Sequence, residues 1–278
     1  MNTRTRVAAV AATLATALSG AVLVPTQVDA AGRVPTVRAT ALDASIRLSM
    51  HRVTAGLVRF RVVAPSGNHT LQLFRLRKGY TLGMFERDVE NAFMGMVGAV
   101  RRVDRRVLWA GGAMAKAQHP GRFAQVLTAG TYYLFDQGGP GITKLTVTGR
   151  VAPRVGPATS STIVGTDRDR FRAPAAIPRK GWTLFRDIST EPHYLVLQHV
   201  KRGTTRAQVR SFVKSMGGGK PAWVRRGQTS SGVVSGHTQT RFHYSLPRGQ
   251  YLLSCWWPSD ETGMPHATMG MYRMVNLR

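Results

Sequence analysis

The chain has 278 residues, of which 43% are hydrophobic, and its formal net charge at pH 7 is +26. The composition is globular and excludes a chain without a buried core, while the single cysteine excludes a disulfide framework. The excess of basic residues predicts attraction to polyanions: wall polymers, acidic polysaccharides, anionic lipid or nucleic acid.

Residues 1–30 have the pattern of a secretory signal peptide. A basic start with Arg4 and Arg6 precedes the apolar run VAAVAATLATALSGAVLV, and the small residues before Ala30 predict cleavage after it. The alternative is a membrane anchor, because the run approaches the length of a membrane span. No later segment is apolar enough to span a bilayer. We therefore expect a secreted, extracellular protein without a transmembrane anchor, held to the cell wall by its charge.

A weak internal repeat divides the remaining chain. GNHTLQLFRLRKGYT (67–81) aligns with EPHYLVLQHVKRGTT (191–205), which lies 124 residues later, and AGTYYLFD (129–136) aligns with RGQYLLSC (248–255). Two pairs of similar segments that follow one another in the same order predict two copies of one domain. Chance similarity between short strands is the alternative.

The repeat sets the expected domain boundaries. We predict an N-terminal domain over residues 40–150 and a C-terminal domain over residues 161–278. Residues 151–160, rich in proline, serine and alanine, form the predicted linker.

Each copy consists mainly of short, β-branched or aromatic segments bounded by Gly, Pro or Asn, which predict strands. Apolar residues at helical spacing predict one helix in each copy, near Thr81 to Met96 and near Thr205 to Met216. Thr205 and Gln208 have the spacing of a capping box. The predicted fold is therefore all-β, with two Greek-key β-sandwich domains that each carry a short helical insertion.

Four side chains of the second copy form a candidate metal site. His193 opens a strand, Cys255 lies near the end of another, His266 precedes the final strand, and Met271 lies on that strand. Two imidazoles and a thiolate with a long methionine contact suit a copper ion that changes oxidation state. Each residue also has an alternative role that needs no metal. His193 then forms a hydrogen bond at a strand end and His266 caps a turn. Cys255 and Met271 are then packed core residues.

At this point the second copy resembles the cupredoxins, the plastocyanin- and azurin-like blue copper proteins. The resemblance covers about residues 181 to 278 and rests on EPHYLVL, on GQYLLSC and on PHATMGM. It implies a cupredoxin-like fold and bound copper, with His193, Cys255 and His266 as equatorial ligands. It also implies Met271 as the axial ligand, with Met269 as its rival. The departure is the ten-residue segment WWPSDETGMP between the cysteine and the second histidine, where the family has only a few residues.

The first copy differs at the same positions. His69 is present, but Asp136 replaces the cysteine, and neither histidine nor methionine follows it in QGGPGITKLTVTG. We therefore expect an N-terminal domain without soft ligands, which acts as a structural part or a binding surface.

These observations predict a secreted cupredoxin-like protein that binds one copper ion for electron transfer or copper handling, with a redox partner protein. The alternative is a non-catalytic cationic module of the cell envelope that binds anionic wall polymer or polysaccharide. The chain has no hydrolase motif and lacks the His-x-His pairs of multicopper oxidases, so we expect that it is not an enzyme. Basic and aromatic residues do not alternate, so no specific nucleic-acid site is expected.

Overall fold

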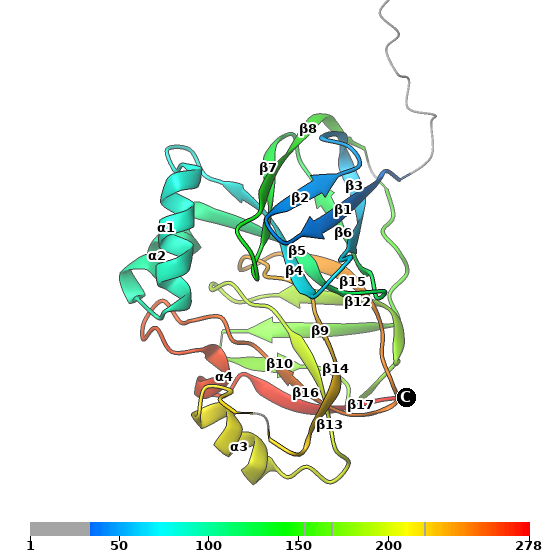
Figure 1. Ribbon diagram of the computed structural model, residues 1–278, viewed down its shortest axis with the longest axis vertical. Helices are drawn as coiled ribbons and strands as arrows, with labels where there is room; N and C mark the ends of the chain where they lie inside the picture. Colours follow the sequence, from blue (N-terminus) through cyan, green and yellow to red (C-terminus); the bar gives the residue numbers. More distant parts are fainter. Residues whose placement is uncertain (1–33, 153, 168, 220) are drawn as a thin grey trace, which may run out of the picture. The chain divides into compact units, whose positions relative to one another are not determined.

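The computed structural model describes residues 34–152, 154–167, 169–219 and 221–278. These residues form two sheets and four short helices (Figure 1). The prediction of an all-β fold is confirmed. The predicted signal peptide, residues 1–30, lies outside the described residues. Among the described helices, none is long and apolar enough to cross a membrane.

The larger sheet has twelve strands. Ten of them follow one another in the order β10 (Arg170–Arg172), β9 (Ser161–Thr166), β12 (Lys180–Asp187), β15 (Gln239–Ser245), β6 (Gly121–Leu127), β3 (Arg52–Val63), β8 (Ile142–Ala152), β7 (Gly130–Asp136), β4 (Asn68–Leu76) and β5 (Val107–Lys116). The other two are β1 (Thr36–Leu42), which pairs with β3, and β2 (Ser45–Leu48), which pairs with β1.

The smaller sheet contains strands of the second half only. Its order is β11 (Ala176–Ile177), β17 (Tyr272–Leu277), β16 (Gly249–Ser254), β13 (Val196–Val200) and β14 (Val224–Ser230). This sheet carries the segments on either side of the candidate metal site.

The two halves of the chain share the larger sheet through an antiparallel pairing of β6 with β15. At this junction Phe60, Phe123 and Phe242 lie opposite one another on three neighbouring strands. All three are buried, and the rings of Phe60 and Phe123 stack with centroids 4.4 Å apart. The core is therefore continuous across the junction. β8 ends at residue 152 and β9 begins at residue 161, but the predicted domain boundaries stay a prediction.

Both predicted helices are present, although shorter than expected. The four helices are α1 (Leu82–Phe93), α2 (Val97–Arg106), α3 (Arg206–Lys214) and α4 (His266–Met269). Thr205 and Gln208 form the predicted capping box at the start of α3.

Two helices were not predicted. α2 covers the basic segment RRVDRR and buries Ala99, Val100 and Val103 on one face. α4 occupies a segment that was expected to belong to the last strand, because a turn at Gly270 in the left-handed conformation separates it from β17. Met271 consequently precedes the last strand rather than lying on it.

The aromatic junction between β6 and β15 predicts a large loss of stability on truncation. Phe123→Ala removes a fully buried ring that contacts both halves, and we expect the free energy of unfolding to fall by about 3–5 kcal/mol. Val126→Ala on the same strand is the matched control. Its side chain is 48% exposed, so a change below about 0.5 kcal/mol is expected. Urea unfolding of both variants measures the difference, and equal losses would refute a shared core at this junction.

Candidate metal centre

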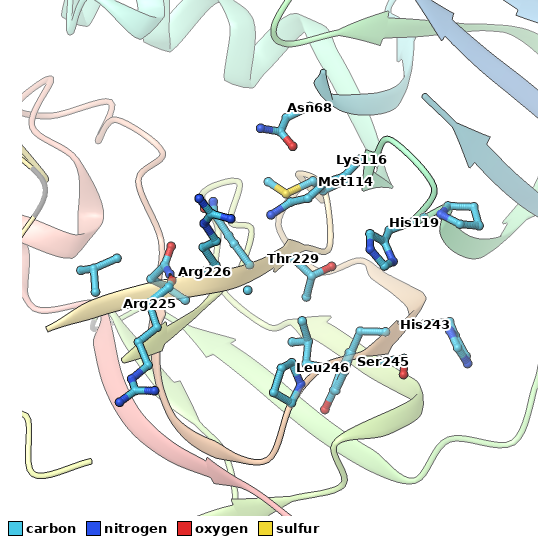
Figure 2. A pocket seen from close by; sticks show the side chains of 18 of the residues that line it. Asn68, Met114, Lys116, His119, Arg225, Arg226, Thr229, His243, Ser245 and Leu246 are labelled. Atoms are coloured by element: carbon cyan, nitrogen blue, oxygen red, sulfur yellow. The ribbon is translucent and has the colours of Figure 1, made fainter. Parts of the chain in front are cut away.

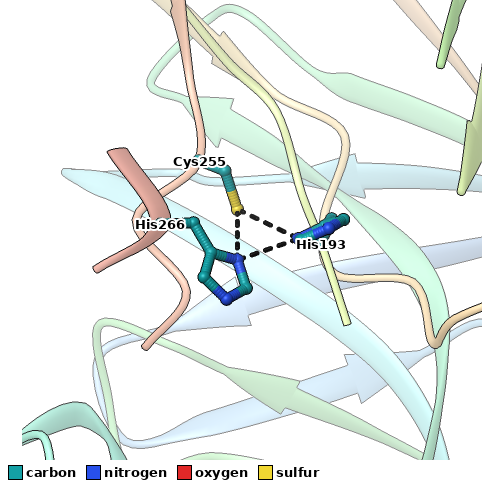
Figure 3. A group of neighbouring side chains, drawn as sticks. All are labelled: His193, Cys255 and His266. Carbon is teal, nitrogen blue, oxygen red and sulfur yellow. Dashed lines mark hydrogen bonds between the residues drawn. The ribbon is translucent and has the colours of Figure 1, made fainter. Parts of the chain in front are cut away.

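The structure brings three of the four predicted side chains together. The Nδ1 atoms of His193 and His266 are 2.9 Å apart, and Cys255 Sγ lies 3.9 Å and 3.8 Å from them (Figure 3). His193 is 1% exposed, and the other two side chains are fully buried. Of the described residues, these form the one group of three histidine, cysteine or acidic residues that could hold a metal ion.

Each side chain is fixed by the local backbone. His193 exchanges two backbone hydrogen bonds with Val234, of 3.0 and 2.9 Å, which hold it just before β13. Its ring packs over Gly165, where an added Cβ would lie 3.1 Å from Cδ2. Glycine at this position therefore gives the imidazole the room it needs.

The long segment between Cys255 and His266 returns to its starting point through its own backbone. The N–H of His266 donates to Trp257 O at 2.8 Å, and the N–H of Ala267 donates to Cys255 O at 2.6 Å. The N–H of Cys255 donates to Met271 O at 3.1 Å. The ten-residue insertion thus folds as a closed loop that leaves the thiol and the imidazole side by side.

The donor atoms fit a single metal ion. The point that is equally far from the two Nδ1 atoms and Sγ, in their plane, lies about 2.1 Å from each. This distance is close to a metal–nitrogen bond of about 2.0–2.1 Å and a metal–sulfur bond of about 2.3 Å. Two imidazole nitrogens and a sulfur are also the donors that copper and zinc prefer. The cluster could therefore bind a metal ion.

Glu191, two residues before His193, completes the surroundings of His266. Its Oε2 accepts a hydrogen bond from His266 Nε2 at 2.7 Å. This contact fixes the proton on Nε2 and directs Nδ1 toward Cys255 and His193. A carboxylate that orients a ligating histidine in this way also raises its basicity.

The two histidines differ in their affinity for a proton. Burial and the nearby charge of His266 hold the pKa of His193 well below its usual value. Burial alone would lower the pKa of His266, but hydrogen bonds to Cys255 and Glu191 outweigh burial and raise it to about 10. Without metal, the His266 ring is therefore protonated on both nitrogens, so that Nε2–H donates to Glu191 and Nδ1–H donates to the neutral ring of His193. A bound metal must displace the proton on Nδ1.

The structure separates the two candidate axial methionines. Met271 is fully buried, and an added Cβ on Gly165 would lie 3.4 Å from its methyl group and close to the His193 ring. Met269 is 39% exposed, and its sulfur accepts a hydrogen bond from Thr262 at 3.8 Å. Of the two methionines, Met271 is thus the one buried near the His193 ring, and its role as a ligand stays a prediction.

The corresponding site of the first half is a hydrogen-bonded pair without a sulfur. His69 Nδ1 lies 2.5 Å from Asp136 Oδ2, and Asp136 Oδ1 accepts from the backbone N–H groups of Thr70 and Gly138. Both oxygens of this carboxylate are thus already paired with hydrogen-bond donors.

Sequence reasoning missed the residues that hold the loop from outside. Asp104 on α2 accepts a hydrogen bond from Trp257 Nε1 at 3.2 Å, and burial raises its pKa to about 8. The Trp257 ring packs edge-on against Trp109, with centroids 5.4 Å apart. No sequence pattern joins these residues. Glu191, by contrast, stands in the motif EPHYLVL, where its position before the histidine could have pointed to it.

Comparisons with known proteins find copper proteins among the solved structures that the chain resembles. Among solved structures, the chain resembles auracyanin from Roseiflexus castenholzii, with 17% identity and a TM-score of 0.30 over 44% of this chain and 99% of that one. It also resembles the copper-containing nitrite reductase of Thermus scotoductus SA-01, with 10% identity and a TM-score of 0.23. The match covers 87% of this chain and 61% of that one. A third similar structure is a multicopper oxidase from Pediococcus acidilactici, with 10% identity and a TM-score of 0.23. The match covers 88% of this chain and 59% of that one.

The resemblance to cupredoxins that the sequence indicates is thus matched by solved structures, among them auracyanins, one of which is described as a blue copper protein. No family model matches the chain, and no curated protein matches it by sequence.

The expectation that the chain is not an enzyme, which rested on missing hydrolase and oxidase motifs, is contradicted by the comparisons. The similar structures include a copper-containing nitrite reductase and multicopper oxidases, which are enzymes. The physical reason is that a β-sandwich framework does not determine the chemistry of the site it carries. The missing motifs excluded only particular hydrolase and oxidase reactions.

The contact between Glu191 and His266 predicts a pH-dependent contribution to stability. The pKa of His266 is raised in the folded protein from 6.5 to about 10. Its stabilising effect is therefore fully present below pH 6.5 and is lost as the pH rises through about 10. We expect Glu191→Gln to destabilise the metal-free protein by about 1–2 kcal/mol at pH 6 and to have little effect above pH 10, as measured by urea unfolding.

Glu261→Gln is the matched control, because Glu261 is an exposed carboxylate on the loop that leads to His266. It should show no such dependence on pH. A destabilisation by Glu191→Gln that stays constant from pH 6 to pH 10 would contradict the assigned proton on His266.

Proposed function

We propose that this protein binds one copper ion through His193, Cys255 and His266, with Met271 as the axial contact. The convergence of three buried donor atoms within 3.9 Å of one another carries this proposal. The same three residues are separated by 62 and 11 positions in the chain, so their meeting is not a consequence of sequence proximity.

The chain's residues suit an ion that changes oxidation state. When bound, copper would supply one-electron chemistry. The sulfurs of Cys255 and Met271 are soft donors that suit the reduced ion, whereas imidazole suits both states. Burial and the closed loop keep water away from the donors and fix their positions. We therefore infer a role in electron transfer or copper handling outside the cytoplasm, with a redox partner protein. The secretory pattern of residues 1–30 supports the location.

Copper titration of the purified protein tests this proposal. We expect one equivalent of Cu(II) to produce an intense visible band from charge transfer between the Cys255 thiolate and copper, because an aliphatic thiolate on Cu(II) absorbs in the visible. Cys255→Ser should remove the band while the protein stays folded, as checked by thermal unfolding. A wild-type protein that remains colourless and retains no copper would refute a blue copper site.

Two methionine variants serve as a matched pair in the same titration. Met271→Leu removes a donor to the oxidised ion, so the band should persist with a shifted maximum and the reduction potential should rise. Met269→Leu should leave both unchanged. The reverse result would assign the axial contact to Met269.

A second candidate function is attachment to anionic polymers of the cell envelope. The net charge of +26 favours it, since a strongly basic surface attracts polyanions of any sequence. This function is compatible with copper binding, because it requires only the distributed surface charge.

Salt dependence tests this attachment. Raising the salt concentration from about 0.01 M to about 0.1 M shortens the Debye length from about 30 Å to about 10 Å. Binding to isolated cell walls should then weaken by about tenfold or more. Attachment that does not respond to salt would count against an electrostatic interaction.

A further inference from the structure

A large groove lies away from the candidate metal centre. It has a volume of about 1210 Å³, and none of the four predicted ligands lines it. Figure 2 shows Arg225 and Arg226 on one side, with Lys116 and His119 on the other. The volume exceeds the roughly 300–1,000 Å³ of an ordinary small-molecule pocket. A segment of a longer molecule is therefore a better fit than a single small ligand.

One wall of the groove is an open sheet edge. β14 is the last strand of the five-stranded sheet and pairs only with β13 among the described strands. Residues 224–229 of β14 all line the groove. An open edge presents backbone N–H and C=O groups in the spacing of a further strand. An extended peptide can pair with such an edge, whereas a sugar polymer or a nucleic acid lacks the matching backbone.

The side chains of the groove are basic and have no acidic counterpart. Lys116, Arg225 and Arg226 line it, and no aspartate or glutamate is found among its lining residues. These three form no ion pair within the described part of the chain. Arg225 and Arg226 are exposed. Burial lowers the pKa of Lys116.

Charge decides between the peptides that could occupy the groove. A second copy of this chain would bring another +26 to a basic surface, and like charges facing each other are unfavourable. An acidic peptide would neutralise both walls. Apolar lining residues such as Met114, Phe212 and Leu246 can accept the alternate side chains that a strand places toward the protein.

We propose that this groove binds an extended acidic segment of a partner protein, which adds as a strand to the open edge of β14. The backbone of β14 supplies the affinity, and the basic side chains on both walls select acidic residues. This inference does not depend on copper, so either proposal can fail without the other.

A labelled peptide of about ten residues, the length of a long strand, tests the proposal with the full chain. The probe alternates glutamate with threonine or valine, and fluorescence anisotropy measures its binding. We expect saturable binding that weakens by about tenfold or more in the double variant Arg225→Ala/Arg226→Ala. Hydrogen exchange should show new protection of those amides among residues 225–229 that face away from β13 when the peptide is bound.

Two controls separate strand addition from charge attraction alone. Arg59→Ala/Arg61→Ala removes the same charge from exposed positions on β3 outside the groove, so peptide binding should change less than about twofold. A peptide of the same sequence with N-methyl groups at alternate residues keeps its charge but cannot complete the ladder, and it should lose most of its binding.

Three results would overturn the proposal. The first is a wild-type protein that does not bind the acidic peptide. The second is equal binding of the plain and N-methylated peptides. The third is an equal loss of binding in both double variants, together with displacement of the peptide by a polyanion. The polyanion is polygalacturonate or an oligonucleotide, added at the same concentration of negative charge as the peptide. That last result would assign the groove to polyanions in general.

Discussion

The closure of the loop between Cys255 and His266 is the constraint on which the candidate metal centre depends. Ten residues separate the two donors, and an open loop of this length would place them at unrelated points. Here the backbone hydrogen bonds from His266 to Trp257 and from Ala267 to Cys255 form the neck of the loop. The bond from Cys255 to Met271 fastens that neck to the start of the last strand. These bonds join main-chain atoms, so they hold the backbones of Cys255 and His266 together without a metal ion.

The first half of the chain holds this loop in place. Trp257 packs against Trp109 and Phe93 and donates to Asp104 on α2. The Arg101 side chain donates to the carbonyl of Asp260 at 2.7 Å, and Figure 1 shows α2 beside this part of the loop. The helices of the first half are thus structural supports for a site in the second half.

Local pattern was enough to predict the strands, α3 and its cap, because these depend on neighbouring residues such as Thr205 and Gln208. The pattern also indicated the three donor residues of the candidate metal site, since each lies near the end of a predicted strand. It did not reveal α2, whose apolar face consists of alanine and valine among arginines and therefore looked like a charged run. Nor did it reveal the carboxylate partner of His266, because Glu191 lies 75 residues earlier and meets it only in the folded chain. Contacts of this kind depend on how the strands pair, which single-sequence pattern does not determine.

The metal centre and the groove are joined by a short path. Trp256 is bonded directly to Cys255, and its ring packs edge-on against Phe212 with centroids 5.9 Å apart. Phe212 in turn lines the groove beside β14. A peptide in the groove would therefore lie one ring contact and one residue from a proposed copper ligand. Trp256 also donates to Ser254 Oγ at 3.0 Å, so its ring is held by this hydrogen bond on one side and by Phe212 on the other.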